Sequence, residues 1–218
     1  RLLSLLAGQA ASAVHNARLF EETRRRSEEL AALAEVSAAL RFANTRAEML
    51  PVILGQVTAL LRAEGAELDI LEPESGDLRI ELAHGVWEPL TGEIIPAGGG
   101  VSAEVLATTR SFVSEDVRAH PRRYRPDLSG EACAVAGVPL AAQGHAVGVL
   151  WAARSTPFTP GEVGLLTAIG DMTGSAIVRA GLHEQTEERL RRLTSLRTID
   201  EAISSSLDLR VTLDVFLQ

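Results

Sequence analysis

The stretch Gly98-Gly-Gly-Val-Ser-Ala-Glu-Val-Leu-Ala-Thr-Thr-Arg-Ser-Phe-Val-Ser-Glu-Asp-Val117 lies near the middle of the chain and divides its predicted strands into two groups. Its three glycines break the regular pattern before it, and Val101, Val105 and Leu106 then follow the spacing of a short helix. A brief strand is predicted at residues 112–113. This part of the chain is therefore a loop-rich insertion between two parts of a sheet.

Two helices are predicted before this stretch. Residues 30–40 repeat apolar side chains with helical spacing, and residues 49–61 do so again. Thr45 and Glu48 stand between them at the spacing of a capping box, in which each side chain bonds to the backbone N–H of the other residue. We therefore expect the second helix to begin at this box.

A β-hairpin is predicted next, from alternating apolar and charged residues. Its strands cover residues 66–70 and 78–82, and the turn-rich residues 73–77 connect them. Alternation with a period of two places the apolar side chains on one face and Glu67 and Asp69 on the other. We expect the hairpin to have one face in the core and one face, with these two carboxylates, in water.

Two largely apolar strands and a long helix follow the central stretch. Residues 132–140 and 146–153 are the strands, joined by a turn at Gln143-Gly144, and their continuous apolar character indicates central positions in the sheet. Residues 159–162 form a second capping box, with proline at the first helical position. These elements predict an α+β domain, with a central antiparallel sheet and helices packed on one of its faces.

The composition excludes several classes of function. The chain has 218 residues and a net charge of -8, which disfavours general binding to nucleic acid. All 21 basic residues are arginine, which excludes P-loop and other lysine-dependent chemistry. Cys133 is the single cysteine, so the chain has no CxxC pair and no cysteine zinc cluster. We expect no metal, cofactor or catalytic residue, no contact with a membrane, and a location in the cytoplasm.

The two ends of the chain repeat each other. When Leu165 is laid on Leu2, the sequences match without a gap to the last residue, with many identical leucines and alanines. Two unrelated helices rich in these residues would also align in part. The repeat, together with a first residue other than methionine, predicts a piece of a longer tandem protein. We expect residues 1–27 to close a preceding domain, residues 28–186 to form a complete domain, and residues 187–218 to be a linker helix and the opening helix of a following domain.

A heptad-like seam runs along the last predicted helix. Its positions step by alternating three and four residues, as in a coiled coil, and its polar members would weaken it or set its register. We expect it to pair two copies of the chain in a parallel homodimer, because a helix that joins two domains has no third element to cover it. The same spacing also fits a core face within one chain. The seam residues are Leu182, Thr186, Arg189, Leu193, Leu196, Asp200, Ile203 and Leu207.

Together, these patterns resemble a GAF domain. Residues 98–117 are similar to the central motif of that family, and residues 135–140 and 147–150 are similar to its paired core strands. Residues 158–162 resemble the entry to the closing helix, and residues 6–21 resemble a closing helix as well. The resemblance implies a sheet of about six antiparallel strands, a small-molecule pocket under the central loops in many members, and a dimer that transmits signals through its end helices.

The chain departs from the GAF subclasses that have a defined ligand or activity. Cyclic-nucleotide-binding members carry a lysine, which this chain lacks, and a glutamate where Val117 stands, although Phe112 and Asp116 have the expected spacing. Bilin attachment needs a cysteine in the central loops, and the methionine sulfoxide reductases need more than one cysteine. The resemblance therefore implies a non-catalytic sensory or regulatory module of a multidomain signalling protein, such as a two-component system, with its output domain in the same chain. A ligand-free dimerisation spacer is the alternative.

An arginine-rich loop is the candidate ligand site. It follows the central stretch in an otherwise acidic chain, and guanidinium groups suit the phosphate or carboxylate of a small anionic molecule. The resemblance places this loop beside the mouth of the pocket. A solvated loop is the alternative, and for the cysteine at the start of the next strand the alternative is a buried apolar role. The candidate residues are Arg118, His120, Arg122, Arg123, Tyr124 and Cys133.

Overall fold

The computed structural model describes residues 2–42, 45–122 and 132–216. It divides into two units, Arg1–Ile177 and Val178–Gln218, and each unit is described by itself. The helices are α1 (Leu2–Phe42), α2 (Arg46–Leu61), α3 (Ser102–Thr108) and α4 (Pro160–Phe216), with short 3-10 helices η1 (Glu88–Leu90) and η2 (Val117–Ala119). The strands are β1 (Gly65–Leu71), β2 (Leu78–Gly85), β3 (Ile94–Ile95), β4 (Phe112–Ser114), β5 (Ala134–Ala142) and β6 (His145–Arg154).

The first unit contains a six-stranded sheet in the order β3-β2-β1-β6-β5-β4. Every neighbouring pair in it is antiparallel. β5 and β6 lie at inner positions, as their apolar sequences predicted, and the turn between them has Gln143 and Gly144 at positive φ. The predicted α+β fold with a central antiparallel sheet is confirmed.

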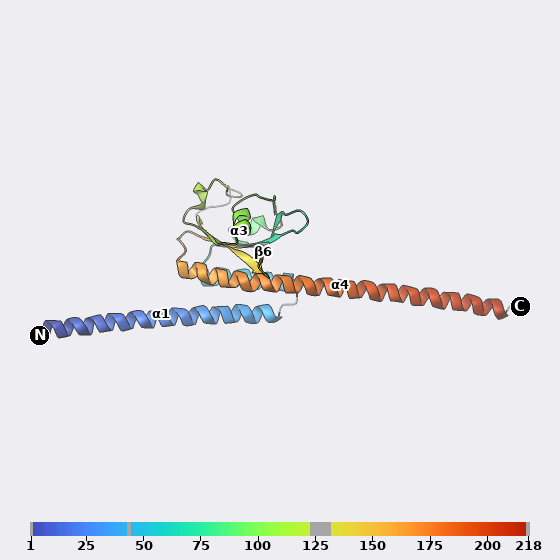
Figure 1. Cartoon of the computed structure of the whole chain (residues 1–218), viewed down its shortest axis with the longest axis horizontal. Helices are drawn as coiled ribbons and strands as arrows, with labels where there is room; N and C mark the ends of the chain where they lie inside the picture. Colours follow the sequence, from blue (N-terminus) through green and yellow to red (C-terminus); the bar gives the residue numbers. More distant parts are fainter. Residues whose placement is uncertain (1, 43–44, 123–131, 217–218) are drawn as a thin grey trace. The chain divides into compact units, whose positions relative to one another are not determined.

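Two layers cover the two faces of this sheet. On one face, α2, the first part of α4 and the end of α1 share a core with apolar side chains of β1, β5 and β6. On the other face, α3 and the loops around it pack on β2, β5 and β6. Figure 1 shows α3 and the start of α4 on opposite sides of β6. We call these two faces the helix side and the loop side of the sheet.

The helix side packs closely because α4 carries a glycine where it crosses β5. A Cβ atom at Gly174 would lie 2.6 Å from the carbonyl carbon of Leu140 and 2.6 Å from the carbonyl oxygen of Ala141. Both are backbone atoms, which cannot move aside without displacing the strand. The missing side chain therefore sets how near α4 approaches the sheet.

We expect Gly174→Ala to lower the free energy of unfolding by about 1–3 kcal/mol, because the added methyl group forces the helix away from the strand. Gly164→Ala on the same helix is the control, since a Cβ atom there has no neighbour within 4 Å. Alanine should stabilise that position by up to about 1 kcal/mol through its helix propensity. Urea unfolding followed by tryptophan fluorescence measures both variants, and equal effects would contradict this account.

Both predicted capping boxes form hydrogen bonds at helix starts. Thr45 Oγ1 accepts a bond from the Glu48 N–H at 3.3 Å, just before α2. Before α4, the Glu162 N–H donates to Thr159 Oγ1 at 3.4 Å, and Glu162 Oε2 accepts a bond from the Thr159 N–H at 2.8 Å. The two helices therefore begin where the sequence predicted, because these side chains satisfy N–H groups that have no partner within the helix.

The prediction of a wet face on the β-hairpin is wrong for β1, whereas Arg79 on β2 has a side chain that is 39% exposed. Glu67 is 9% exposed and Asp69 is 0% exposed, although the alternation placed both in water. β1 lies between β2 and β6 in the interior of the sheet, and the loop side covers its second face. Both faces of β1 are therefore buried. Its apolar residues, such as Leu68, face the helix side, and its two carboxylates face the loop side.

The second unit consists of the part of α4 after Ile177. α4 is continuous from Pro160 to Phe216, and α1 is continuous from Leu2 to Phe42. The predicted domain limits after residues 27 and 186 thus fall inside helices and stay predictions. In the part of the chain that the structure describes, no helix combines the length and the apolar character needed to cross a membrane.

Candidate functional site

Two carboxylates of β1 lie near the centre of the loop side. Glu67 and Asp69 are alternate residues of this strand and so extend from the same face of the sheet. Each has one cross-strand neighbour on β2 and one on β6, and all four neighbours are buried. Both carboxylates are therefore enclosed by apolar side chains on either side. These neighbours are Ala83 and Trp151 for the first carboxylate, and Ile80 and Val149 for the second.

A buried hydrogen-bond chain holds one oxygen of Asp69. Ser102, the first residue of α3, donates from its Oγ to Asp69 Oδ2 at 2.8 Å. The Trp151 Nε1–H of β6 in turn donates to Ser102 Oγ at 3.0 Å. Since the three side chains come from β1, α3 and β6, this chain fixes the short helix to the sheet and orients the carboxylate.

Burial changes the acidity of both carboxyl groups. It raises the pKa of Asp69 from 3.8 to about 7, although the hydrogen bonds from Ser102 and Trp151 act in the opposite direction. Burial also raises the pKa of Glu67 well above its usual range, and the negative charges of Asp69 and Glu93 raise it further. In both cases the low polarity of the surroundings disfavours the ionised form. Asp69 thus changes its charge close to neutral pH.

One oxygen of each carboxylate has no hydrogen-bond partner. Glu67 Oε2 and Asp69 Oδ1 are buried, and neither bonds to any residue that the structure describes. An unsatisfied polar atom in the interior costs about 1–3 kcal/mol, and such atoms in a native structure commonly have a functional reason. Within the described residues, no three His, Cys, Asp or Glu side chains are arranged to hold a metal ion.

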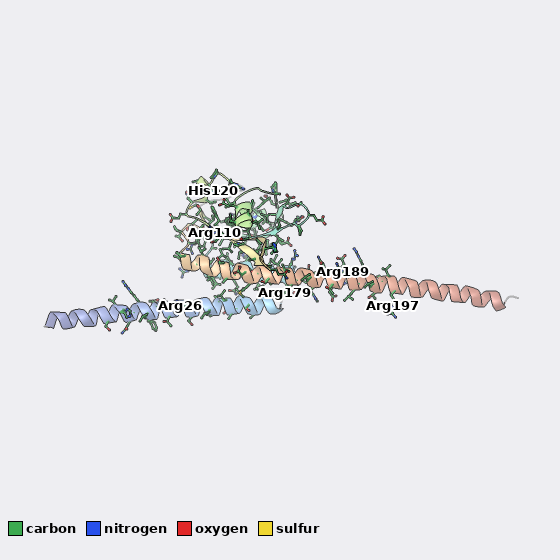
Figure 2. All side chains as sticks on the ribbon, viewed as in Figure 1. Arg26, Arg110, His120, Arg179, Arg189 and Arg197 are labelled. Atoms are coloured by element: carbon green, nitrogen blue, oxygen red, sulfur yellow. The ribbon has the colours of Figure 1, made fainter. Side chains whose placement is uncertain are left out.

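Aromatic contacts lead from this pair towards the predicted ligand loop. The Trp151 ring covers Gly137 of β5, where a Cβ atom would lie 2.4 Å from the ring. Phe112 of β4 meets Trp151 edge-on with 6.0 Å between ring centroids, and His120 meets Phe112 edge-on at 5.2 Å. Figure 2 shows His120 on the loop side, away from α4. A series of contacts therefore connects the buried carboxylate Asp69 with one of the predicted ligand residues.

The two described arginines among the predicted ligand residues have partners within the chain. Arg118 donates from Nε to Asp116 Oδ1 and from Nη2 to Asp116 Oδ2, each at 2.8 Å, and these bonds raise the pKa of Arg118. Arg122 donates from Nη2 to the carbonyl oxygen of Gly98 at 2.9 Å, which links this loop to the central glycines. The guanidinium fork of Arg118 is thus occupied by a carboxylate of the same chain.

Cys133 lies one residue before β5 and is half-buried, so its expected place inside the strand is wrong by one position. Pairing with β6 begins at Ala134, and Cys133 lies beyond that last pair. Its carbonyl oxygen instead accepts the Val117 N–H at 2.8 Å, which joins it to η2. Arg123 and Tyr124, the other two candidates, lie outside the described residues.

A surface depression with a volume of about 400 Å³ lies beside α3 and β4. Its lining is mainly polar and holds one acidic and one basic side chain. It shares Phe112 with the aromatic contacts described above, so it opens on the same side of the sheet. The lining residues are Glu104, Val105, Thr108, Arg110, Ser111 and Phe112.

Comparison with known proteins identifies the fold. The family model described as the GAF domain matches residues 18–177. The chain belongs to the GAF domain family. A GAF domain from a phosphoenolpyruvate-protein phosphotransferase of Coxiella burnetii is similar, with 19% identity, 72% of this chain and 96% of that chain covered, and a TM-score of 0.66.

Two further solved structures share this GAF fold. A free methionine-R-sulfoxide reductase from Neisseria meningitidis, in complex with its substrate, has 20% identity and a TM-score of 0.61, with 69% of this chain and 89% of that chain covered. Part of a methyl-accepting chemotaxis protein has 20% identity and a TM-score of 0.59, with 67% and 97% covered. At these identities the likeness establishes the fold.

The sequence patterns missed the carboxylate pair of this GAF domain. The continuous apolar character of β5 and β6 did indicate a sheet covered on both faces, and a strand beside β6 would then also be covered on both faces. The apolar runs of β5 and β6 are thus better evidence for burial than the alternation on β1. The alternation places Glu67 and Asp69 on a common face but does not show whether that face is covered. Ser102 and Trp151 had no such signal, because they are 49 residues apart and meet only in the fold.

Proposed function

We propose that this GAF domain is a non-catalytic sensory or regulatory module of a multidomain signal-transduction protein. In this proposal a small molecule binds on the loop side, and a change in helix packing passes through α1 and α4 to the neighbouring domains. The observation that carries the proposal is that both helices extend far past the residues that pack on the sheet. A ligand would shift the helix packing only by binding two packings unequally.

The setting that we propose is a cytoplasmic signalling protein with its output domain in the same chain. One structure with this fold comes from a chemotaxis protein and another from a phosphotransferase protein, and both support a regulatory context. The repeat of the two chain ends supports a tandem arrangement. In it, residues 1–27 close one GAF-like domain, residues 28–186 form the next, and residues 187–218 lead into a third.

A catalytic role is not part of this proposal. The similar reductase is an enzyme, but the resemblance to such reductases implies more than one cysteine, and this chain has Cys133 alone. On the loop side, the hydroxyl of Ser102 bonds to the carboxylate of Asp69, but both groups are buried and the tryptophan N–H of Trp151 holds the serine oxygen in a structural hydrogen-bond chain. We therefore assign this face to binding.

Exposed apolar side chains on α4 support a homodimer. Leu182, Leu193 and Leu196 of the predicted seam are 57%, 63% and 60% exposed, and Thr186 and Arg189 are exposed as well. Figure 2 shows Arg189 and Arg197 extending outward from this helix. A row of exposed leucines is unfavourable in water, and a second copy of the helix would cover it. The side chains of Asp200, Ile203 and Leu207 lie outside the description.

We expect the double substitution Leu193→Glu and Leu196→Glu to weaken the homodimer at least about 100-fold, because it places four charges in the seam. Sedimentation equilibrium of the whole chain over a concentration series measures this effect. Arg191→Glu is the matched control, since Arg191 is exposed on the same helix but lies outside the seam. A wild-type chain that stays monomeric at high micromolar concentration would rule out the helical dimer.

Two experiments distinguish ligand sensing from the ligand-free spacer. They are native mass spectrometry of the purified chain and thermal unfolding in the presence of nucleotides and common metabolites. A small molecule that co-purifies or raises the unfolding temperature supports sensing. If no molecule does either, and the chain is dimeric, the ligand-free spacer is the better account.

A further inference from the structure

The buried carboxylates of β1 lack the partners that such groups require. Of the four oxygens of Glu67 and Asp69, Asp69 Oδ2 accepts a hydrogen bond from Ser102, whereas Glu67 Oε2 and Asp69 Oδ1 are buried and bond to no described residue. A buried carboxylate is stable as an ion only when a cation or several donors compensate it. The pair therefore either holds protons or receives a positive group from outside the described chain.

We propose that Glu67 and Asp69 form a recognition site for the positively charged group of a small-molecule ligand, an ammonium or a guanidinium, on the loop side of the sheet. This inference rests on the proposed sensory function and names the chemical class that the site would select. This site is distinct from the arginine-rich loop, whose positive charges would suit an anionic ligand.

The spacing of the two carboxylates suits one shared cation. Alternate residues of a strand lie roughly 6.5–7 Å apart along the same face. An ammonium or guanidinium group between them could donate to both free oxygens, since each such group has several N–H donors. Glu93 also contributes negative charge at Glu67, which strengthens the attraction for a cation.

The surroundings of the pair add selectivity for an organic cation. Ile80 and Val149 lie on either side of Asp69, and these apolar neighbours suit an alkyl-substituted cation better than a hydrated metal ion. The hydrogen bond from Ser102 holds one carboxylate oxygen of Asp69 and leaves Oδ1 for the ligand. Glu67 retains 9% of its exposure and Asp69 none, so access from solvent is at Glu67.

Trp151 would report on the binding event. Its indole N–H donates to Ser102, which donates to Asp69, so a cation at this carboxylate changes the polarisation of both hydrogen bonds. The chain has two tryptophans, Trp87 and Trp151, so its proton–nitrogen spectrum contains two indole signals. Assignment by Trp87→Phe then identifies the one that responds.

The test uses n-butylamine and n-butylguanidine as probes, with n-butanol as the neutral control of matching shape. At pH 8 we expect both cations to shift the indole signal of Trp151 and to raise the unfolding temperature, while n-butanol does neither. Because the cation competes with the proton on Asp69, its affinity should fall by at least about tenfold per pH unit below pH 7, and more steeply where Glu67 is also protonated. Calorimetry in buffers of different ionisation enthalpy should show proton release on binding at pH 6.

Substitutions of the pair complete the experiment. Asp69→Asn and Glu67→Gln should each lower the affinity for n-butylamine at least about tenfold, since each removes one of two charges that hold the cation. Glu115→Gln, which removes an exposed carboxylate, should leave the affinity unchanged. The folded state of each variant is checked by its unfolding temperature without ligand.

The results separate this inference from the proposed function. If n-butylamine binds equally to the wild type and to Asp69→Asn, or fails to bind the wild type at pH 8, the cation site is wrong. If a metabolite still binds both single variants with wild-type affinity, sensing stands and this site is again wrong. If no compound of any charge binds, the sensory proposal itself fails.

Discussion

Replacing Arg154 by methionine is expected to lower the free energy of unfolding by about 3–5 kcal/mol, because it leaves a buried charge network without its cation. The side chain is 9% exposed, and all five of its N–H groups donate hydrogen bonds. Three go to backbone carbonyl oxygens and two to the carboxylate of Glu162 at 2.9 and 2.8 Å. The three carbonyl groups belong to Leu61 at 2.6 Å, Thr156 at 2.9 Å and Pro157 at 2.8 Å.

The effect is large because one side chain joins three parts of the helix side. Its partners are the last residue of α2, the loop after β6, and the first turn of α4. The guanidinium also lies 4.2 Å from the ring centroid of Phe158, and its hydrogen bonds hold the pKa of Glu162 at about 2. Methionine keeps the apolar stem and removes every donor, so all of these groups lose a partner together. Lysine should recover little, since an ammonium group cannot present the same fork.

Urea unfolding of the whole chain, followed by tryptophan fluorescence, measures this prediction. Arg79→Met is the control, because Arg79 forms an ion pair with Glu72 and its side chain is 39% exposed. That pair should contribute at most about 1 kcal/mol. If Arg154→Met and Arg79→Met lower the stability equally, the buried network is not what holds the three elements together.

Local patterns predicted most of the fold. The capping boxes at Thr45 and Thr159, the turn at Gln143 and the apolar runs of β5 and β6 depend on residues within a few positions of one another, and the structure agrees with each of them. The capping boxes and the turn follow from backbone hydrogen bonding and allowed dihedral angles, which do not depend on what packs against the element. The apolar runs indicate strands that are covered on both faces. For this reason the elements and the class of fold were predictable.

The candidate site was not predictable in the same way, because it depends on which elements meet. Alternation on β1 identified the face that carries Glu67 and Asp69, but not the layer that covers it. The contact between Ser102 and Trp151 joins α3 to β6 across the loop side, and no periodicity reports such a contact. The arginine-rich loop was found from its charge, yet a charge pattern does not show that Asp116 occupies the fork of Arg118.

Asp69→Asn is expected to remove a pH-dependent loss of stability from this domain. Folding raises the pKa of Asp69 from 3.8 to about 7, so between these values the folded state holds a proton that the unfolded state releases. Stability therefore falls as pH rises from about 4 to about 7 and then stays level. A shift of this size corresponds to about 4 kcal/mol at most, and we expect about 2–4 kcal/mol in practice.

Urea unfolding curves between pH 4 and pH 8 measure the free energy of unfolding of the wild type and of Asp69→Asn. An asparagine amide places an N–H group where Asp69 Oδ1 has no partner, which costs about 1–3 kcal/mol at every pH. The variant should therefore be less stable than the wild type at pH 4. The difference in the free energy of unfolding between variant and wild type should then change by about 2–4 kcal/mol in favour of the variant by pH 8. Glu67→Gln should act in the same direction, and the double variant should gain less than the sum, because the charge of Asp69 is one cause of the raised pKa of Glu67.

Asp171→Asn, at an exposed position of α4, controls for the general effect of removing a carboxylate. Curves for the wild type and Asp69→Asn that run parallel from pH 4 to pH 8 would show that Asp69 is already compensated when ionised. In that case its partner would have to be a cation supplied within the chain, and the cation-binding inference would lose its physical basis. A steep wild-type curve that the variant flattens would instead mean that the free protein keeps this carboxyl group neutral up to about pH 7, which is the state that a cationic ligand would displace.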